Sequence, residues 1–393
     1  MNMRIPLSAP DITQAEIDAV TAVLRSPYLC FGPELTEFET ALARYHFVDH
    51  AVAVSSGTAG LHLALIALGI GEGDEVIVPS FAFIAVANTV RQVRAVPVFA
   101  EIDPLPLNLD PSSVELAITP RTRAILVVHT FGIPAQMDAL QSIASSHGLA
   151  LIEDACEAIG AEFDGRRVGS FGDMAVLGFY PNKQITTGEG GAVLCRDASH
   201  AARLRSLRNQ GRSGDGWYDH AEPGFNYRLS DIACALGRVQ LGRIDEILAL
   251  RAQVAERYNA LLKIINGLEL PPLELPQRKL SWFVYVVRLP EGVNREQVQA
   301  AMAGKGIATG RYFAPLHQQP AFRAEKSTPQ LHLAVTERLA PRMLALPFFN
   351  RITQGDQQEV ADALRSAIHD ARQRQASSVA ELVRNSEAPY LDE

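Results

Sequence analysis

The stretch GFYPNKQITTGEGGAV, residues 178–193, places one lysine, Lys183, between an aromatic turn and the glycine-rich run GEGG. A lysine in a tight, partly apolar turn is suited to Schiff-base chemistry, because desolvation lowers its pKa and frees the amine to attack a carbonyl. A surface lysine in a glycine-rich loop explains this stretch equally well. The surrounding sequence has to distinguish between the two interpretations.

Upstream of this stretch, short apolar strands alternate with amphipathic helices. The predicted strands are residues 51–54, 75–80, 96–103, 124–129 and 149–154, and the predicted helices are residues 13–24, 34–45, 57–68, 84–93 and 137–148. This alternation predicts βαβ units and an α/β fold, with a mainly parallel mixed sheet flanked by helices. Ligands bind such sheets at the carboxyl ends of the strands. Polar motifs that follow strands are therefore the first candidates for a site.

The downstream part predicts a second, smaller domain. Its expected elements are a long helix at 230–260, a strand at 282–290 and a helix at 295–306. We expect a large domain at 1–250, whose N-terminal segment can pack on the small domain, and an α+β domain at 251–393. The tail from about Gln375 is polar and is expected to fray.

Composition restricts the possible functions. The 393 residues are 47% apolar and 20% charged, which is typical of a globular protein with a large core. The net charge is −8 and the Lys and Arg residues are scattered, so neither nucleic acid nor an acidic membrane surface is an expected partner. The four cysteines form no CxxC pair, and the N-terminus does not resemble a signal peptide. We therefore expect a cytoplasmic protein with reduced thiols and no metal site.

The tetrapeptide Ser55-Ser56-Gly57-Thr58 closes the strand at 51–54 and opens the helix at 57–68. A turn of small residues at a helix N-terminus offers free backbone N–H groups and the positive end of the helix dipole, which together suit a phosphate. Plain N-capping by Ser or Thr is the better interpretation of this tetrapeptide in isolation.

Two further motifs follow strands. The run EDACE at 153–157 comes directly after the apolar run LALI at 149–152. Its Asp154 could stay ionised against a protonated ring nitrogen, because the opposite charge lowers its pKa. An acidic N-cap is the alternative. The run PSFAF at 79–83 offers an aromatic face, although aromatic residues at such positions more often belong to a core.

The four motifs share one edge of one predicted sheet. A phosphate-binding turn, an aromatic face, an acid for a ring nitrogen and a lysine for an aldehyde are the groups that pyridoxal phosphate (PLP) requires. The combination is far more specific than any single motif. It predicts a PLP-dependent enzyme.

The chain carries, in this order, the motifs SSGTAGLHLAL, PSFAFIAVAN, IEDACEAIGAEFDGRRVGSFGD, GFYPNKQITTGEGG, LRNQG, GFNYRLSDI, RYFAPLHQQPAF and LALPFFN. From about Ile5 to about Arg365 it resembles the DegT/DnrJ/EryC1/StrS family of sugar aminotransferases. The resemblance implies PLP-dependent transferase fold type I and a homodimer with shared active sites. It also implies transfer of an amino group from L-glutamate, which leaves as 2-oxoglutarate, through pyridoxamine phosphate to a nucleotide-linked keto sugar.

The resemblance also implies roles for individual residues. Lys183 would form the internal aldimine and carry protons as general base and acid, and Asp154 would hold the protonated ring nitrogen. Phe83 would stack on the ring. The other implied positions are Ser56, Gly57, Thr58 and Glu157 for the cofactor, Asn226 for the phosphate in the neighbouring subunit, and Tyr312 and His317 for the sugar. A loop histidine with no role is the alternative for His317.

Two positions depart from the commonest family pattern. Many members carry a serine five residues before the lysine, where its hydroxyl helps to hold the phosphate, but this chain has Gly178. One phosphate contact must therefore come from elsewhere. Many members also carry Gln or His three residues after the aspartate, where this chain has Glu157. That glutamate resembles the GDP-perosamine synthase branch, which implies conversion of GDP-4-keto-6-deoxymannose to GDP-perosamine.

Other functions stay open at this point. The acceptor could be a dTDP- or UDP-linked 3- or 4-keto sugar, because no physical rule decodes the polar loop at 208–220 that would read the nucleotide. A related sugar dehydratase that uses PLP or pyridoxamine phosphate carries histidine in place of the lysine, so Lys183 argues against it. A non-catalytic regulator is disfavoured, because no helix-turn-helix or basic patch is evident.

Overall fold

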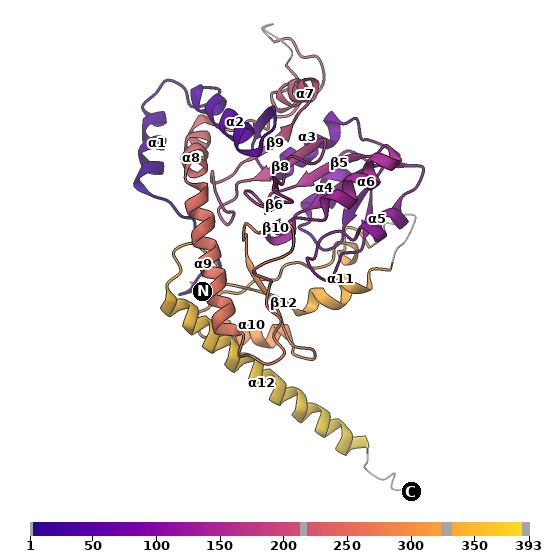
Figure 1. Ribbon diagram of the computed structural model, residues 1–393, viewed down its shortest axis with the longest axis vertical. Coiled ribbons are helices and arrows are strands. Elements are labelled where there is room, and N and C mark those ends of the chain that lie inside the picture. The colour runs from indigo at the N-terminus through magenta and orange to yellow at the C-terminus, as the bar shows by residue number, and fades with distance from the viewer. Residues whose placement is uncertain (1–2, 213–217, 324–331, 387–393) are drawn as a thin grey trace.

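The computed structural model describes residues 3–212, 218–323 and 332–386. Its centre is a seven-stranded sheet with helices on both faces (Figure 1). In spatial order the strands are β1 (His50–Val54), β9 (Gly191–Cys195), β8 (Met174–Gly178), β5 (Ala150–Asp154), β4 (Thr122–Val128), β2 (Glu75–Pro79) and β3 (Val96–Ala100). Strand β9 is antiparallel to both neighbours and the other pairs are parallel. The predicted mainly parallel mixed sheet is confirmed.

Side chains alternate along each strand, so each strand contributes to two cores. In β1, Val52 and Val54 belong to one apolar cluster, whereas Ala51 and Ala53 belong to another. The first cluster contains residues of α3 (Gly57–Ala67), α4 (Ala85–Gln92) and α7 (Ala198–Arg208). The clusters of the other face contain residues of α2 (Pro33–His46), α5 (Pro111–Ala117), α6 (Met137–His147) and α8 (Asp231–Gly242). Helix α1 (Gln14–Leu24) packs on α8.

A separate apolar cluster lies in the second half of the chain, between Val254 and Ala371, and includes Ile5 from the N-terminal segment. It is built from α9 (Ile244–Leu262), α10 (Arg295–Gly304), α12 (Gln354–Ser386) and the antiparallel pair β11 (Tyr285–Arg288) and β12 (Met343–Leu346). The remaining elements are β6 (Glu162–Phe163), β7 (Arg166–Arg167), β10 (Arg278–Lys279), α11 (Ala334–Leu339), η1 (Thr130–Gly132), η2 (Leu316–Gln318) and η3 (Ala340–Arg342). The domain boundary near residue 250 stays a prediction, and α9 runs across it.

Three predicted elements differ from the structure. The prediction of a single helix at 230–260 is wrong, because α8 ends at Gly242 and α9 begins at Ile244. Glycine has a low helix propensity, and the guanidinium of the intervening Arg243 is held by Asp11 at 2.7 Å. The strand at 282–290 is shorter, because Trp282 has a left-handed backbone (φ 54°).

The tail is also more regular than predicted. Instead of fraying from about Gln375, α12 continues to Ser386, because the run QASSVAEL contains several good helix formers and extends a helix that already packs on α9 and α10. Residues 387–393 lie outside the described residues.

Candidate active site

The four sequence motifs meet at the carboxyl ends of four strands. Residues 56–58 follow β1, Phe83 follows β2, Asp154 ends β5 and the loop of Lys183 follows β8. They line one pocket of about 490 Å³. Of the predicted site residues, the pocket is lined by Ser56, Gly57, Thr58, Phe83, Asp154, Glu157, Lys183 and Tyr312. Chain segments far apart in sequence therefore share one cavity.

The first wall of the pocket is the N-terminus of α3. The Ser56 Oγ accepts a hydrogen bond from the Ala59 N–H at 3.0 Å, so the N-capping interpretation is correct. Capping uses an oxygen lone pair and one N–H group. The Ser56 hydroxyl hydrogen and the other first-turn N–H groups, which have no acceptor within the helix, can still bind an anion. Capping and phosphate binding are therefore compatible here.

Lys183 lies in a tight turn, where its N–H donates to the Tyr180 carbonyl at 2.9 Å. Its side chain is only 15% exposed, and Nζ lies 3.5 Å from Oε1 of Glu157. Nζ also lies 3.9 Å from the centre of the Phe283 ring. The amine is thus enclosed between a carboxyl group and an aromatic face, which excludes the alternative of a surface lysine.

Glu157 is buried beside this amine. Its Oε2 accepts the Phe131 N–H at 3.0 Å, and Phe131 adopts a left-handed backbone (φ 59°) at that point. Burial raises the pKa of Glu157, although the nearby Lys183 charge opposes this shift. Glu157 therefore keeps a proton at higher pH than an ordinary glutamate.

Asp154 reaches the pocket from the last position of β5. It is 7% exposed, and its Oδ1 accepts the Cys156 N–H at 3.0 Å. The preceding residue, Glu153, points to the other face of the sheet, because side chains alternate along a strand. Of this pair, the sequence analysis selected Asp154, and Asp154 is the acid that lines the pocket.

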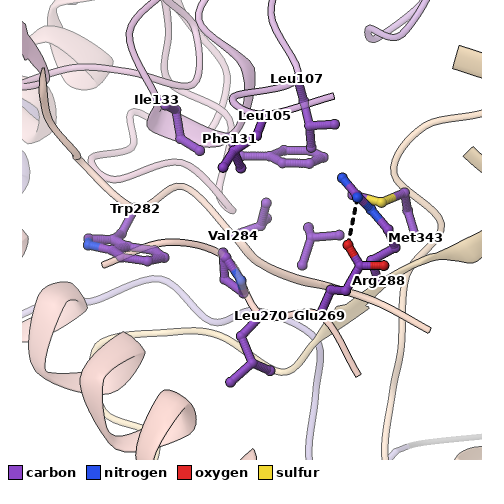
Figure 2. A pocket seen from close by; sticks show the side chains of 12 residues that line it. Leu105, Leu107, Phe131, Ile133, Glu269, Leu270, Trp282, Val284, Arg288 and Met343 are labelled. Atoms are coloured by element: carbon purple, nitrogen blue, oxygen red, sulfur yellow. Dashed lines mark hydrogen bonds and ion pairs between the residues drawn. The ribbon is translucent and has the colours of Figure 1, made fainter. Parts of the chain in front are cut away.

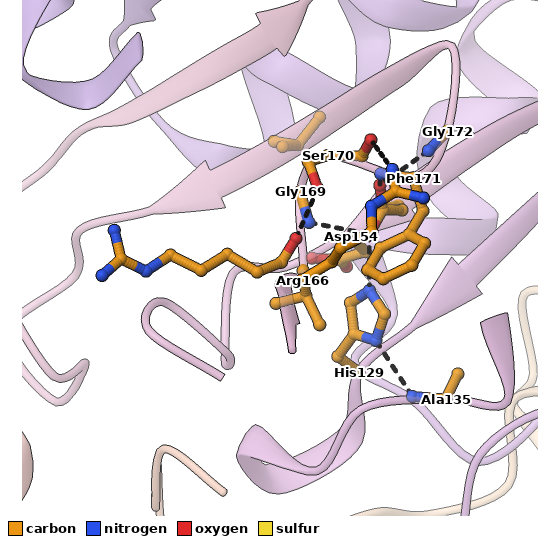
Figure 3. Close-up of polar contacts among 12 residues, drawn as sticks. His129, Ala135, Asp154, Arg166, Gly169, Ser170, Phe171 and Gly172 are labelled. Carbon is orange, nitrogen blue, oxygen red and sulfur yellow. Dashed lines mark hydrogen bonds and ion pairs between the residues drawn. The ribbon is translucent and has the colours of Figure 1, made fainter. Parts of the chain in front are cut away.

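Glu153 stabilises the turn at residues 169–172 by accepting hydrogen bonds from its backbone, and Figure 3 shows this turn in close-up. Its carboxylate accepts four hydrogen bonds, from the Gly169, Phe171 and Gly172 N–H groups at 2.7, 2.7 and 2.8 Å and from His129 Nε2 at 3.0 Å. Burial alone would raise the pKa of Glu153, but the hydrogen bonds from His129 and the turn outweigh it, so the pKa is lowered. Glu153 is a structural anion.

The tautomer of His129 follows from its second contact. The Ala135 N–H donates to His129 Nδ1 at 3.1 Å, so Nδ1 carries no proton (Figure 3). The proton of the neutral ring is on Nε2 and points at Glu153. The contact between the two side chains is therefore a hydrogen bond from the Nε2–H group to the Glu153 carboxylate.

The sequence interpretation missed several residues that line the pocket, among them Cys156, Asn182, Phe283 and Phe313. Asn182 and Phe313 are chain neighbours of Lys183 and Tyr312, so proximity in sequence was an available signal. Phe283 lies in a segment predicted as an ordinary strand, and no sequence signal distinguishes it. Phe83 is 59% exposed in the pocket wall, so its ring face is accessible to a ligand.

A second, apolar pocket of about 160 Å³ lies next to Phe131 (Figure 2). Its apolar lining comes from Leu105, Leu107, Phe131, Ile133, Leu270, Pro271, Trp282, Val284, Val286 and Met343. The two charged residues that line it, Glu269 and Arg288, pair with each other at 2.7 Å. The pocket thus offers no free acid or base, in contrast to the Lys183 pocket.

Two predicted site residues lie outside the lining of the Lys183 pocket. His317 makes contacts through both ring nitrogens, with Nδ1 2.6 Å from Ser80 Oγ and Nε2 3.0 Å from Glu337 Oε1. Asn226 is exposed and forms a backbone bridge with Asn209. Their predicted roles at the sugar and at the phosphate of the neighbouring subunit stay predictions.

The side chains of the Lys183 pocket fit PLP. The helix N-terminus offers donors to a phosphate, Phe83 offers an accessible ring face, Asp154 offers a buried acid, and Lys183 offers an enclosed amine. Within the described residues, no group of His, Cys, Asp and Glu is arranged to hold a metal ion. None of the described helices has both the length and the hydropathy needed to cross a bilayer. The fold and the site define a PLP-dependent transferase of fold type I.

Comparison with known proteins identifies the family. The sequence pattern of the DegT/DnrJ/EryC1/StrS aminotransferase family matches residues 10–365, and the chain belongs to this family. It is 41% identical to GDP-perosamine synthase of Caulobacter vibrioides over 365 residues, which cover 92% of this chain and 97% of that protein. The chain is therefore a PLP-dependent nucleotide-sugar aminotransferase.

Solved structures agree with this assignment. The chain resembles DesV of S. venezuelae in complex with a ketimine intermediate, with a TM-score of 0.85, 38% identity and coverage of 93% of this chain and 99% of that one. It also resembles the PLP-form of Spr1654 from Streptococcus pneumoniae, with a TM-score of 0.87, 26% identity and coverage of 93% and 99%. Spr1654 is also known in a PMP-form, and both cofactor forms therefore occur on this fold.

Proposed function

We propose that the protein transfers the amino group of L-glutamate to GDP-4-keto-6-deoxymannose and forms GDP-perosamine. The observation that carries this proposal is the 41% identity to GDP-perosamine synthase over 92% of the chain. The presence of Glu157 in the pocket, where many family members have Gln or His, supports the same branch.

Bound PLP supplies an electron sink that stabilises negative charge on the carbon next to the transferred nitrogen. Lys183 would hold the cofactor through its amine, and its Nζ would carry a proton to and from the substrate carbon. Asp154 keeps a proton on the ring nitrogen through its negative charge. The 56–58 turn binds the phosphate, and Phe83 orients the ring.

Glu157 has a separate role next to Lys183. Its carboxyl lies 3.5 Å from Nζ, and burial raises its pKa. A carboxyl group that exchanges its proton at a higher pH than usual can share a proton with the lysine amine. Glu157 thus holds Lys183 in place while the lysine is free of the cofactor.

A homodimer with shared sites and a cytoplasmic location complete the proposal. Exposed Asn226 is available to reach the phosphate of a second copy, and Tyr312, which lines the pocket, is available to the sugar. The four cysteines are all free, which supports a reducing compartment. Light scattering of the purified protein tests the dimer: a monomer at working concentration would contradict it.

The substrate proposal is tested by an assay of the purified protein with L-glutamate and keto sugars linked to GDP, dTDP or UDP. We expect GDP-4-keto-6-deoxymannose to give the highest kcat/KM and NMR of the product to place the new amine at C4. A preference for a dTDP- or UDP-linked sugar, or amination at C3, would replace the GDP-perosamine proposal with another sugar of the same class. A deoxygenated product without nitrogen would indicate a dehydratase.

A further inference from the structure

Gly178 lacks the side chain that many family members use to hold the phosphate, and the structure shows what fills that space. Gly178 ends β8 and lines the Lys183 pocket beside Gly57, the first residue of α3. A Cβ atom added to Gly178 would lie 3.1 Å from both Cβ and Sγ of Cys156, which is tighter than ordinary carbon contacts. The side chain of Cys156 therefore occupies the space next to position 178.

The same sulfur lies against the start of α3. A Cβ atom added to Gly57 would lie 2.7 Å from Cys156 Sγ and 3.5 Å from the Gly178 Cα. On the other side, a Cβ atom added to Gly191 at the start of β9 would lie 2.7 Å from the Gly57 nitrogen. The first turn of α3 is thus enclosed between the β9 backbone and Cys156. A shift of the sulfur would move the N–H groups of this turn.

The thiol itself is suited to packing rather than to binding an anion. Sγ lies 3.7 Å from the Val176 carbonyl oxygen, to which the S–H group donates. Burial, with the nearby Asp154 charge, raises the pKa of Cys156 well above its usual value, so the group is a neutral thiol. It neither repels a phosphate nor offers it a strong donor.

We propose that Cys156 and Gly178 are a matched pair of positioning residues that sets the phosphate end of the cofactor pocket. The sulfur fixes the separation between the end of β8 and the first turn of α3, and the phosphate is then held from the α3 side by the 56–58 turn. The missing hydroxyl at position 178 is compensated by this geometry. The inference rests on the cofactor and is independent of the identity of the sugar.

The test is a double-mutant cycle on the full-length protein stripped of cofactor. The variants are Gly178→Ser, Cys156→Ala and the double variant, and the measured quantities are the Kd of PLP and the Kd of pyridoxal, which lacks the phosphate. Gly178→Ser forces the sulfur toward Gly57, so we expect PLP to bind about tenfold more weakly. In the double variant the smaller alanine makes room for the serine, and the Kd of PLP should return to within about threefold of the original value.

The phosphate-free ligand separates positioning from general packing. We expect the Kd of pyridoxal to change by less than about threefold in all three variants, because pyridoxal does not reach the α3 turn. Effects of the two substitutions that multiply in the double variant would overturn the matched pair. Equal losses for PLP and pyridoxal would overturn the phosphate-specific role.

Controls establish that the variants fold. Gly242→Ser adds the same side chain at a glycine where a Cβ atom meets nothing within 4 Å, and it should leave both Kd values unchanged. The unfolding temperature of each cofactor-free variant shows whether the variant is folded at the temperature of the binding measurement. If Gly178→Ser does not fold, Cys156→Ala alone still tests the idea: a weaker Kd for PLP with an unchanged Kd for pyridoxal supports it, and unchanged affinity for both ligands overturns it.

Discussion

Two buried glutamates, Glu153 behind β5 and Glu157 in the pocket, respond to burial in opposite ways. Glu153 accepts four hydrogen bonds, and its pKa is lowered. Glu157 accepts one backbone hydrogen bond and lies 3.5 Å from an amine, and its pKa is raised. The donors aimed at each buried carboxyl group, rather than burial itself, account for the opposite directions of the two pKa shifts.

This difference separates a glutamate with a structural role, Glu153, from a glutamate that can take part in chemistry, Glu157. A carboxylate with a complete set of donors is locked in one protonation state and stabilises the turn that supplies the donors. A carboxyl group with an incomplete set remains able to gain or lose a proton, as chemistry at Lys183 requires. Substitutions of the pocket residues and of the structural residues test this separation.

The largest effect is expected for Lys183→Ala, which removes the amine that faces Glu157. Loss of the proton carrier alone should lower kcat by roughly 10²- to 10⁴-fold, while the unfolding free energy changes little because the side chain belongs to the pocket and not to a core. Lys279→Ala is the control, because Lys279 is 60% exposed and pairs with Glu162 on the surface. Full turnover in single-turnover assays of Lys183→Ala would refute the role of this lysine.

Glu153→Gln should have the next largest effect, on stability. The amide cannot accept four hydrogen bonds and places an NH₂ group against N–H donors, so we expect a loss of about 3 kcal/mol in urea unfolding. Glu162→Gln is the control, since a partly exposed pair contributes roughly 0–1 kcal/mol. Because the folded pKa of Glu153 is lowered, its contribution is present above the unfolded pKa and is lost as the pH falls through the folded pKa. An unchanged unfolding free energy would show that the four contacts contribute nothing.

His317→Ala tests whether this separation extends to a residue that the family resemblance places near the sugar. Both ring nitrogens are engaged, by Ser80 and Glu337, as in a structural group. We expect the unfolding free energy to fall by about 1 kcal/mol and the KM of the sugar to stay within about threefold. The control is His147→Ala at an exposed site. A large rise in KM with unchanged stability would instead support the predicted role at the sugar.

The sequence predicted three of the four strands that end at the pocket, β1, β2 and β5, and the motifs that follow them, because hydrophobic alternation and strand-to-turn motifs are local. It did not predict β8, the strand before the loop of Lys183. It did not predict that Glu153 accepts hydrogen bonds from the turn at 169–172, because no local pattern shows how the chain folds back onto this residue. It also did not predict the break at Arg243, which depends on a contact with Asp11 from the N-terminus. Phe283 lies in the site because distant segments of the chain pack together, and no local sequence pattern predicts that packing.

The smallest effect is expected for Glu157→Gln, and its sign is opposite to that of Glu153→Gln. Because the folded pKa of Glu157 is raised, ionisation opposes folding: this cost is absent below the unfolded pKa, grows as the pH rises through the folded pKa and is constant above it. Glutamine cannot ionise and still accepts the Phe131 N–H. We therefore expect the variant to gain up to about 1 kcal/mol over the original protein at neutral pH and nothing at pH 4, as measured by urea unfolding of the cofactor-free protein across this range. A variant that is less stable at neutral pH would mean that the Lys183 amine outweighs burial, in which case Glu157 is a paired anion like Glu153 and the contrast between the two glutamates fails.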